Sequence, residues 1–260
     1  MAESTIENFG FIIVRHMTND IDKQYWHECV HCIRKFYPEE KIIVVDDNSS
    51  LKPSSDQLDI ETYTNVTIVQ AEYPGAGEVL GYYYGWKNKP FKKFVVLHDS
   101  MFLQSKLPEA IPEQQVIFLW HFCTYLGQGV EGYNKDTNVT FINHCKHDQQ
   151  LALFKLYYDK AAWFGNFGVS SMITWTMIDR MFSKYNLLNC LQKITRRHDR
   201  EAMERVFALI AYLEEPLLKI KPSLLGNIIK DYENAYAVKW AQYKKGYRTN
   251  CAVNKVWSGR

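Results

Sequence analysis

Short apolar segments alternate with helix-forming segments through the first hundred residues of this chain. Most of the apolar segments are runs of Ile, Val and Phe without polar alternation, which is typical of strands covered on both faces in a parallel sheet. Amphipathic stretches over residues 22–36 and 78–88 lie between them. The expected strands are residues 11–14, 41–45, 65–70 and 94–97. The alternation predicts an α/β fold with a doubly wound sheet, in which ligands bind at the carboxyl ends of the strands.

The second half of the chain is less regular. Its expected elements are strands over residues 116–118 and 139–142 and helices over residues 149–161, 171–185 and 200–214. No internal repeat, low-complexity segment or long linker divides the chain. We therefore expect one domain over residues 1–260, with a ligand-binding half at about 10–105 and an elaborated half at about 106–260.

The charge balance argues against nucleic acid as a partner. There are 31 Lys and Arg against 29 Asp and Glu, a net charge of +2, whereas nucleic-acid binders usually carry a strong basic field. The longest apolar run, within residues 116–126, is shorter than the ~20 residues of a transmembrane helix. The N-terminus has no basic region of a secretory signal. The six cysteines then predict reduced thiols and a cytoplasmic protein.

Carboxylates follow two of the expected buried strands. Asp46 and Asp47 come directly after residues 41–45, and Asp99 follows residues 94–97. Acidic groups at such strand ends can hydrogen-bond ribose hydroxyls or a base N–H, and Mg²⁺ and Mn²⁺ prefer hard oxygen ligands. Capping of a turn by Asp is the alternative interpretation. The pattern is consistent with one nucleotide pocket.

Two turns bear on the class of nucleotide. A dinucleotide-binding fold requires Gly-x-Gly-x-x-Gly after its first strand, and this chain has RHMT there, which disfavours a dehydrogenase. Gly75, Gly77 and Glu78 precede the helix over residues 78–88, whose terminal N–H groups attract anions. A tight turn with positive φ explains the two glycines equally well.

The order of these segments resembles a known enzyme family. KIIVVDDNSS, a Gly-containing turn with its helix, and FVVLHDS follow one another as in the nucleotide-sugar-binding half of GT-A fold glycosyltransferases, broadly of the family-2 type. The similarity covers about residues 10–105. LHDS, with GAGEVLGYYYGW before it and the terminal KVWSGR, looks most like small glycosyltransferases of large DNA viruses and some microbes. The resemblance implies a GT-A-like, mostly parallel central sheet flanked by helices.

The resemblance also implies donor contacts. In that family the end of the second strand, here Asp46 or Asp47, contacts the nucleoside, and a later Asp-x-Asp binds a metal that bridges the diphosphate. This chain has Asp99 alone at that place, so Asp99 is the candidate ligand for Mn²⁺ or Mg²⁺, with water or Ser100 in the remaining positions. The candidate donor-binding residues are Asp46, Asp47, Gly75, Gly77, Glu78, His98, Asp99 and Arg260.

An acidic cluster stands at the start of the last expected helix. In family-2-like enzymes such a cluster supplies the general base for the acceptor hydroxyl, so the candidate catalytic residues are Glu204, Asp199 and Glu201. Glu204 ranks first, because Ala202 and Val206 flank it and partial burial raises a carboxyl pKa towards the working range of a base. Helix capping and the helix dipole are the alternative explanation for all three acids.

Two further segments are rich in aromatic side chains. Residues 161–168 fit a loop that stacks on an acceptor sugar, and core packing explains them nearly as well. Residues 239–260 hold six basic residues and no acid, yet Trp240, Tyr243 and Trp257 indicate that this tail packs onto the protein. A docked basic tail can neutralise a leaving diphosphate.

The sequence therefore predicts a glycosyltransferase. We expect it to move a sugar from a nucleotide-diphosphate donor, a UDP-sugar, to a hydroxyl of a glycan acceptor by direct displacement with inversion. The protein would position both substrates, deprotonate the acceptor and stabilise the departing diphosphate. Two alternatives stay open. One is a nucleotidyltransferase; the other is a catalytically degenerate fold that binds glycans, which the single Asp of LHDS favours.

Overall fold

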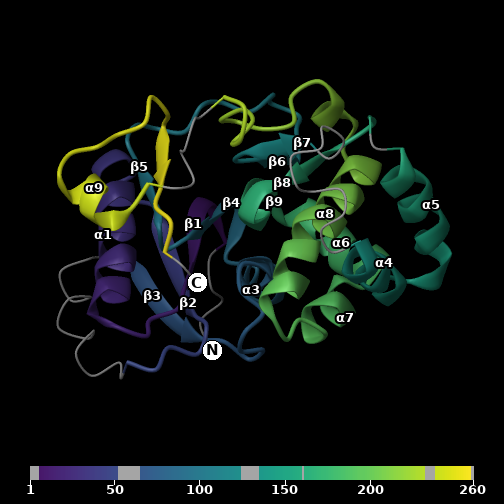
Figure 1. The fold of residues 1–260 in the computed structure, drawn as a ribbon, viewed down its shortest axis with the longest axis horizontal. Helices are drawn as coiled ribbons and strands as arrows, with labels where there is room; N and C mark the ends of the chain where they lie inside the picture. Colours follow the sequence, from purple (N-terminus) through teal and green to yellow (C-terminus); the bar gives the residue numbers. More distant parts are fainter. Residues whose placement is uncertain (1–5, 52–64, 124–134, 160, 232–237, 259–260) are drawn as a thin grey trace.

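A six-stranded, mostly parallel sheet forms the centre of the molecule (Figure 1). The structure is a computed structural model that describes residues 6–51, 65–123, 135–159, 161–231 and 238–258. The strand order is β3-β2-β1-β4-β9-β6, in which the first four strands pair in parallel and β9 runs antiparallel to both of its neighbours. The strands are β1 (Glu7–Arg15), β2 (Lys41–Asp46), β3 (Val66–Gln70), β4 (Phe91–His98), β6 (Val116–Phe118) and β9 (Ser171–Thr174). The predicted α/β class, with a mostly parallel central sheet flanked by helices, is confirmed.

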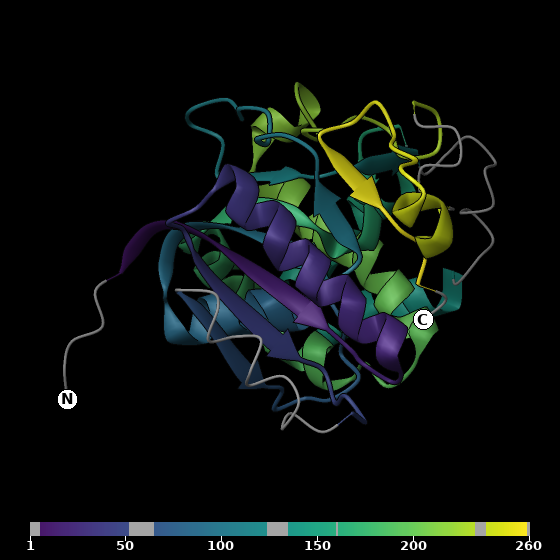
Figure 2. The ribbon, with the colours of Figure 1, turned by 90° about the vertical axis from the view of Figure 1, so that its left-hand side faces the viewer.

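Helices cover both faces of the sheet, which explains why its strands are apolar without alternation. Phe11 and Ile13 of β1 belong to the core beneath α1, whereas Ile12 and Val14 belong to the core beneath α3, α6 and α8. Figure 2 shows α1 lying across one face. The helices are α1 (Asp20–Phe36), α3 (Val79–Asn88), α4 (Lys135–His144), α5 (His147–Tyr158), α6 (Trp175–Tyr185), α7 (Leu187–Gln192), α8 (Arg197–Glu214) and α9 (Trp240–Lys244).

The helix predicted over residues 171–185 begins only at Trp175. The four residues before it form β9, which lies between β4 and β6 with Met172 and Ile173 buried on opposite faces. Thr174 ends the strand and caps α6, because its side chain accepts a hydrogen bond from the Met177 N–H at 3.2 Å. The apolar spacing of residues 171–174 fits a helix as well as a strand. Pairing with β4 and β6 makes the segment a strand.

The strand predicted over residues 139–142 is wrong, since this segment lies within α4. Asn138, Phe141 and Ile142 are buried at helical spacing, and α4 packs against α8. The β-branched residues of the segment favour a strand locally, but tertiary packing overrides that preference. The helices predicted over residues 149–161 and 200–214 are present as α5 and α8.

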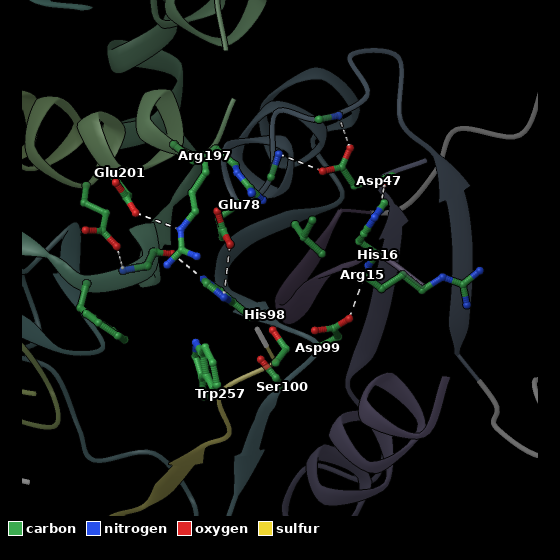
Figure 3. Close-up of a pocket in the computed structure, with 18 of the residues that line it drawn as sticks. Arg15, His16, Asp47, Glu78, His98, Asp99, Ser100, Arg197, Glu201 and Trp257 are labelled. Carbon is green, nitrogen blue, oxygen red and sulfur yellow. Dashed lines mark hydrogen bonds and ion pairs between the residues drawn. The ribbon is translucent and has the colours of Figure 1, made fainter. Parts of the chain in front are cut away.

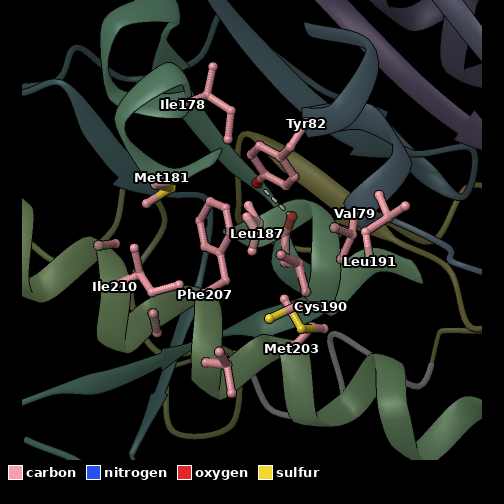
Figure 4. Packing of buried hydrophobic residues seen from close by; sticks show 14 of the residues in the cluster. Val79, Tyr82, Ile178, Met181, Leu187, Cys190, Leu191, Met203, Phe207 and Ile210 are labelled. Atoms are coloured by element: carbon pink, nitrogen blue, oxygen red, sulfur yellow. Dashed lines mark hydrogen bonds between the residues drawn. The ribbon is translucent and has the colours of Figure 1, made fainter. Parts of the chain in front are cut away.

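The position of α8 is fixed by a dense aromatic and aliphatic core (Figure 4). Phe207 of α8 packs against Tyr82 of α3 with ring centroids 4.5 Å apart, and Ile178 and Met181 of α6 lie in the same cluster. The Tyr82 hydroxyl donates a hydrogen bond to the Val169 carbonyl at 2.7 Å. This packing holds the amino end of α8 near the carboxyl ends of the parallel strands.

The basic tail packs on the face of the sheet that α1 covers, opposite the face that α8 covers. Strand β10 (Val253–Lys255) pairs antiparallel with β5 (Met101–Leu103), and the Trp240 and Tyr243 rings of α9 pack against Phe102. The expectation that this tail packs onto the protein is confirmed for its described part. Within the described ranges, no helix combines the length and the apolar character needed to cross a membrane.

Candidate functional site

A pocket of about 920 Å³ lies at the carboxyl ends of β1, β2 and β4, the edge predicted to bind a ligand (Figure 3). Strand ends form one wall, and the amino end of α8 with the loop before β9 forms the other. Its lining includes Arg15, His16, Asp47, Gly75, Gly77, Glu78, His98, Asp99, Ser100, Gly168, Arg196, Arg197, Arg200, Glu201, Glu204, Arg205, Lys255 and Trp257. Most of the predicted site residues therefore come together in one cavity, and Arg260 lies outside the described residues.

Asp47 is the member of the adjacent pair that reaches this pocket. Its two carboxylate oxygens accept the N–H groups of Gly75 at 2.5 Å and Gly77 at 3.0 Å. Burial raises the pKa of Asp47, and the two amide hydrogen bonds offset part of that effect. Both glycines have positive φ, +91° and +59°, so the turn that presents these amides requires glycine.

Asp46 turns away from the pocket and is absent from its lining. Its carboxylate accepts the Arg15 Nε–H at 2.7 Å and the Ser49 N–H at 2.9 Å, and both partners of the ion pair are buried. The Arg15 guanidinium also lies 4.7 Å from the centre of the Trp26 ring. This arrangement joins the ends of β1 and β2 and gives Asp46 a structural role.

Asp99 lies at the end of β4, beside the end of β1. Its carboxylate accepts the His16 N–H at 3.4 Å, and its own N–H donates to the Val14 carbonyl at 3.1 Å. The next residue, Ser100, accepts a hydrogen bond from the Lys255 ammonium at 2.6 Å. Asp99 lines the pocket although only 2% of the residue is exposed.

His98 connects three parts of the site. Its Nε2 lies 2.7 Å from the Gly168 carbonyl, and its Nδ1 lies 3.2 Å from Lys255 Nζ and 3.3 Å from Glu78 Oε1. Burial by itself raises the pKa of Glu78, but the nearby charges of His98, Arg200 and Lys255 outweigh it and lower that pKa overall. Glu78 is therefore an anion that balances the cations around it.

Glu204 combines burial with a position in the pocket. Its Oε1 accepts the Gly168 N–H at 2.8 Å, and its Oε2 lies 3.5 Å from Arg205. Burial raises the pKa of Glu204 to about 7, against the opposing effects of Arg205 and the Gly168 amide. A carboxyl group with this pKa exchanges a proton readily near neutral pH, as a general base must.

The other two predicted acids have visible structural partners. Asp199 is absent from the pocket lining, and its Oδ2 accepts the N–H groups of Thr195 and Arg196 at 3.0 and 3.1 Å. Glu201 lines the pocket but pairs with Arg197 at 3.0 Å and His198 at 2.9 Å. Asp199 thus stabilises the start of α8, the alternative that the sequence left open.

The loop that contacts Glu204 has an unusual backbone. Gly168 has φ +60°, and a Cβ added there would lie 2.7 Å from His98 Nε2. Val169 follows with φ +45°, a left-handed conformation that is rare for a β-branched residue. Such a conformation costs of the order of 1–3 kcal/mol and persists only when surrounding contacts impose it. Gly168 thus connects Glu204, through its backbone N–H, with His98, through its backbone carbonyl.

The arginines of α8 were not predicted as site residues. Arg196, the residue before α8, and Arg197, Arg200 and Arg205 within it all line the pocket. A sequence signal was available, because three of them stand at the amino end of a helix, where the helix dipole disfavours positive charge. Lys255 and Trp257 reach the same pocket from the docked tail.

The residues around Asp99 do not suit the predicted Mn²⁺ or Mg²⁺. Among the described residues, no group of three or more His, Cys, Asp and Glu side chains is placed to hold a metal ion. Ser100, expected to complete the site, binds the Lys255 ammonium. Two positions after Asp99 stands Met101, which is fully buried in the core. A second cation beside this ammonium would be repelled.

Comparison with known proteins gives a likeness of fold only. No family model and no curated protein sequence matches the chain. Similar solved structures include S. aureus TarS with UDP-GlcNAc, at 16% identity over 37% of this chain and 27% of that chain, with a TM-score of 0.31. GalNAc-T7 with UDP, GalNAc and Mn²⁺ matches at 17% identity over 40% and 20%, with a TM-score of 0.32. The galactosyltransferase LgtC with donor and acceptor sugar analogues matches at 12% identity over 76% and 70%, with a TM-score of 0.43. The chain thus spans about a quarter of the length of this TarS structure.

Proposed function

We propose that this protein is a glycosyltransferase that takes a sugar from a nucleotide-diphosphate donor, a UDP-sugar, and transfers it to a hydroxyl group of a glycan acceptor. The observation that carries the proposal is the pairing of two features across one pocket. Carboxylates stand at the ends of parallel strands on one wall, and Glu204, with a pKa of about 7, stands on the other. The sequence resemblance described above agrees with this assignment.

The strand-end wall is suited to the nucleoside. Each carboxylate oxygen of Asp47 accepts one backbone N–H, and a carboxylate offers about four acceptor positions in all. Asp47 can therefore accept a ribose hydroxyl or the N–H of uracil while it holds its turn. The amides of Gly75 and Gly77 point at Asp47, so they fix its orientation before the donor arrives.

Glu204 is suited to activate the acceptor. In the proposed reaction the acceptor hydroxyl gives its proton to Glu204, and its oxygen forms a bond to the anomeric carbon of the donor sugar. The bond from that carbon to the diphosphate oxygen breaks, and its electron pair leaves with the nucleoside diphosphate. Attack opposite the leaving group inverts the anomeric centre. The arginines of α8 lie where they can stabilise the negative charge that develops on the diphosphate.

Binding and turnover measurements test the proposal together. We expect UDP and at least one UDP-sugar to raise the melting temperature, and UDP to bind in isothermal titration calorimetry. Slow hydrolysis of that UDP-sugar in water should release UDP, since water can take the place of the acceptor. Binding without hydrolysis or transfer to any glycan offered would instead support a glycan-binding module. If neither UDP nor any of the nucleotide sugars tested binds, the proposal is overturned.

A further inference from the structure

The C-terminal strand β10 brings a buried ammonium group into the lining of the pocket, and this inference rests on the function just proposed. We propose that Lys255 supplies the positive charge opposite the donor diphosphate, in the role that a divalent cation held by Asp99 would otherwise have. UDP then binds through the chain's own cations, and its affinity does not depend on Mn²⁺ or Mg²⁺.

Strand pairing fixes the position of Lys255. In the antiparallel pair of β5 and β10, Lys255 lies opposite Met101, and the Val256 N–H donates to the Ser100 carbonyl at 2.9 Å. Met101 occupies the position where an Asp-x-Asp motif starting at Asp99 would have its second carboxylate. Lys255, the residue paired with Met101 across the two strands, therefore brings a cation to the place where a metal ligand would be expected.

Two side chains that flank Asp99 orient the ammonium group. Ser100 Oγ lies 2.6 Å from Lys255 Nζ, and His98 Nδ1 lies 3.2 Å from it. The Gly168 carbonyl can only accept a hydrogen bond, so Nε2 of His98 is the donor in that contact, and Nδ1 is the ring nitrogen that faces Lys255. His98 and Ser100 thus hold the lysine instead of completing a metal site.

Burial makes this charge effective. Lys255 is 9% exposed yet lines the pocket, so its charge is less screened by water than that of a surface lysine. Glu78, whose pKa the cations lower, lies close enough to feel Lys255 as well as Arg200. The ammonium and the arginines at the amino end of α8 therefore line one pocket, where they can neutralise a diphosphate. A lysine ammonium binds phosphate oxygens as a compact point charge.

The first test needs no variant. UDP is titrated into the intact protein by calorimetry, once in EDTA and once in Mn²⁺. We expect the two dissociation constants to agree within about twofold. Binding only in Mn²⁺ would overturn the role of Lys255 and leave the glycosyltransferase proposal standing. Failure of UDP to bind in either condition would overturn the proposed function itself, so the two failures are distinguishable.

The second test separates the diphosphate from the nucleoside. Lys255→Met keeps an unbranched side chain, one atom shorter, and removes the charge. Lys245→Met is the matched control, because Lys245 is exposed and outside the pocket lining. In EDTA we expect Lys255→Met to weaken UDP binding about 10- to 100-fold and to leave uridine binding unchanged. Lys255→Arg should restore part of the UDP affinity. Equal losses for UDP and uridine, or a parental UDP affinity in Lys255→Met, would overturn the proposal.

Discussion

The two walls of the pocket hold their charged groups in different ways. On the strand-end wall, Asp47 and Asp99 accept backbone N–H groups from neighbouring turns and strands. On the α8 wall, Arg196 and Arg197 have exposed side chains, whereas Glu204 is mostly buried against a strained loop. The first wall is thus preorganised by the backbone, as recognition requires. The second wall carries arginines with exposed side chains and one carboxyl group with a raised pKa, which are features of a catalytic site.

Replacing Glu204 tests the chemical role of the α8 wall and has the largest expected effect. Glu204→Gln keeps the shape and can still accept the Gly168 N–H, but it cannot take a proton. We expect transfer, or donor hydrolysis, to fall by ~10²–10⁴ while UDP affinity stays within a few-fold. Glu201→Gln is the control, since Glu201 pairs with Arg197 and His198. If Glu204→Gln keeps the parental turnover, Glu204 is not the general base.

The adjacent aspartates of the strand-end wall should respond differently to the same change. Asp46→Ala removes the carboxylate that pairs with the buried Arg15 guanidinium, so the free energy of unfolding should fall by about 3–5 kcal/mol. Asp47→Ala should lower UDP affinity about tenfold or more, because it removes the acceptor that faces the pocket. Urea unfolding and calorimetry measure the two effects. A weaker UDP affinity in folded Asp46→Ala, with Asp47→Ala at the parental value, would reverse the assignment.

The pH dependence of stability tests the burial of Glu204. Its pKa is about 7 in the folded protein against an ordinary value of 4.5, so the folded state binds an extra proton between these values. The stabilising effect is complete below pH 4.5 and is lost as the pH rises through 7. Between pH 5 and pH 8, the parent should lose about 1–3 kcal/mol more unfolding free energy than Glu204→Gln. Parallel pH profiles in urea unfolding would show that Glu204 is hydrated.

The turn of the strand-end wall offers the smallest and most selective change. Gly75 and Gly77 both have positive φ, so replacing either with Ala costs about 1–2 kcal/mol. A Cβ at Gly77 would also lie 2.6 Å from Arg200 Cδ, whereas nothing lies within 4 Å of one at Gly75. We expect Gly77→Ala alone to lower UDP affinity, by a few-fold in calorimetry. Equal affinities in the two variants would mean that Arg200 does not depend on this turn.

The sequence determined the strand-end wall because its signals are local. Uniform apolar runs predicted β1, β2 and β4, and the residues that follow parallel strands meet at one edge whatever else the chain does. The sequence alone therefore predicted that Asp47 and Asp99 lie at the same edge of the sheet. The family resemblance suggested the acidic cluster at the start of α8, and Glu204 ranked first within it because its neighbours Ala202 and Val206 belong to an apolar stripe.

Only the tertiary structure decided the rest, because it depends on contacts between residues far apart in the chain. The choice between Asp46 and Asp47 came from the pairing of Asp46 with Arg15, 31 residues away. Residues 171–174 became a strand through pairing with β4 and β6. Lys255 reached His98 and Ser100 through the register of β10 on β5. Strand register and burial are collective properties, so no local pattern of residues fixes them.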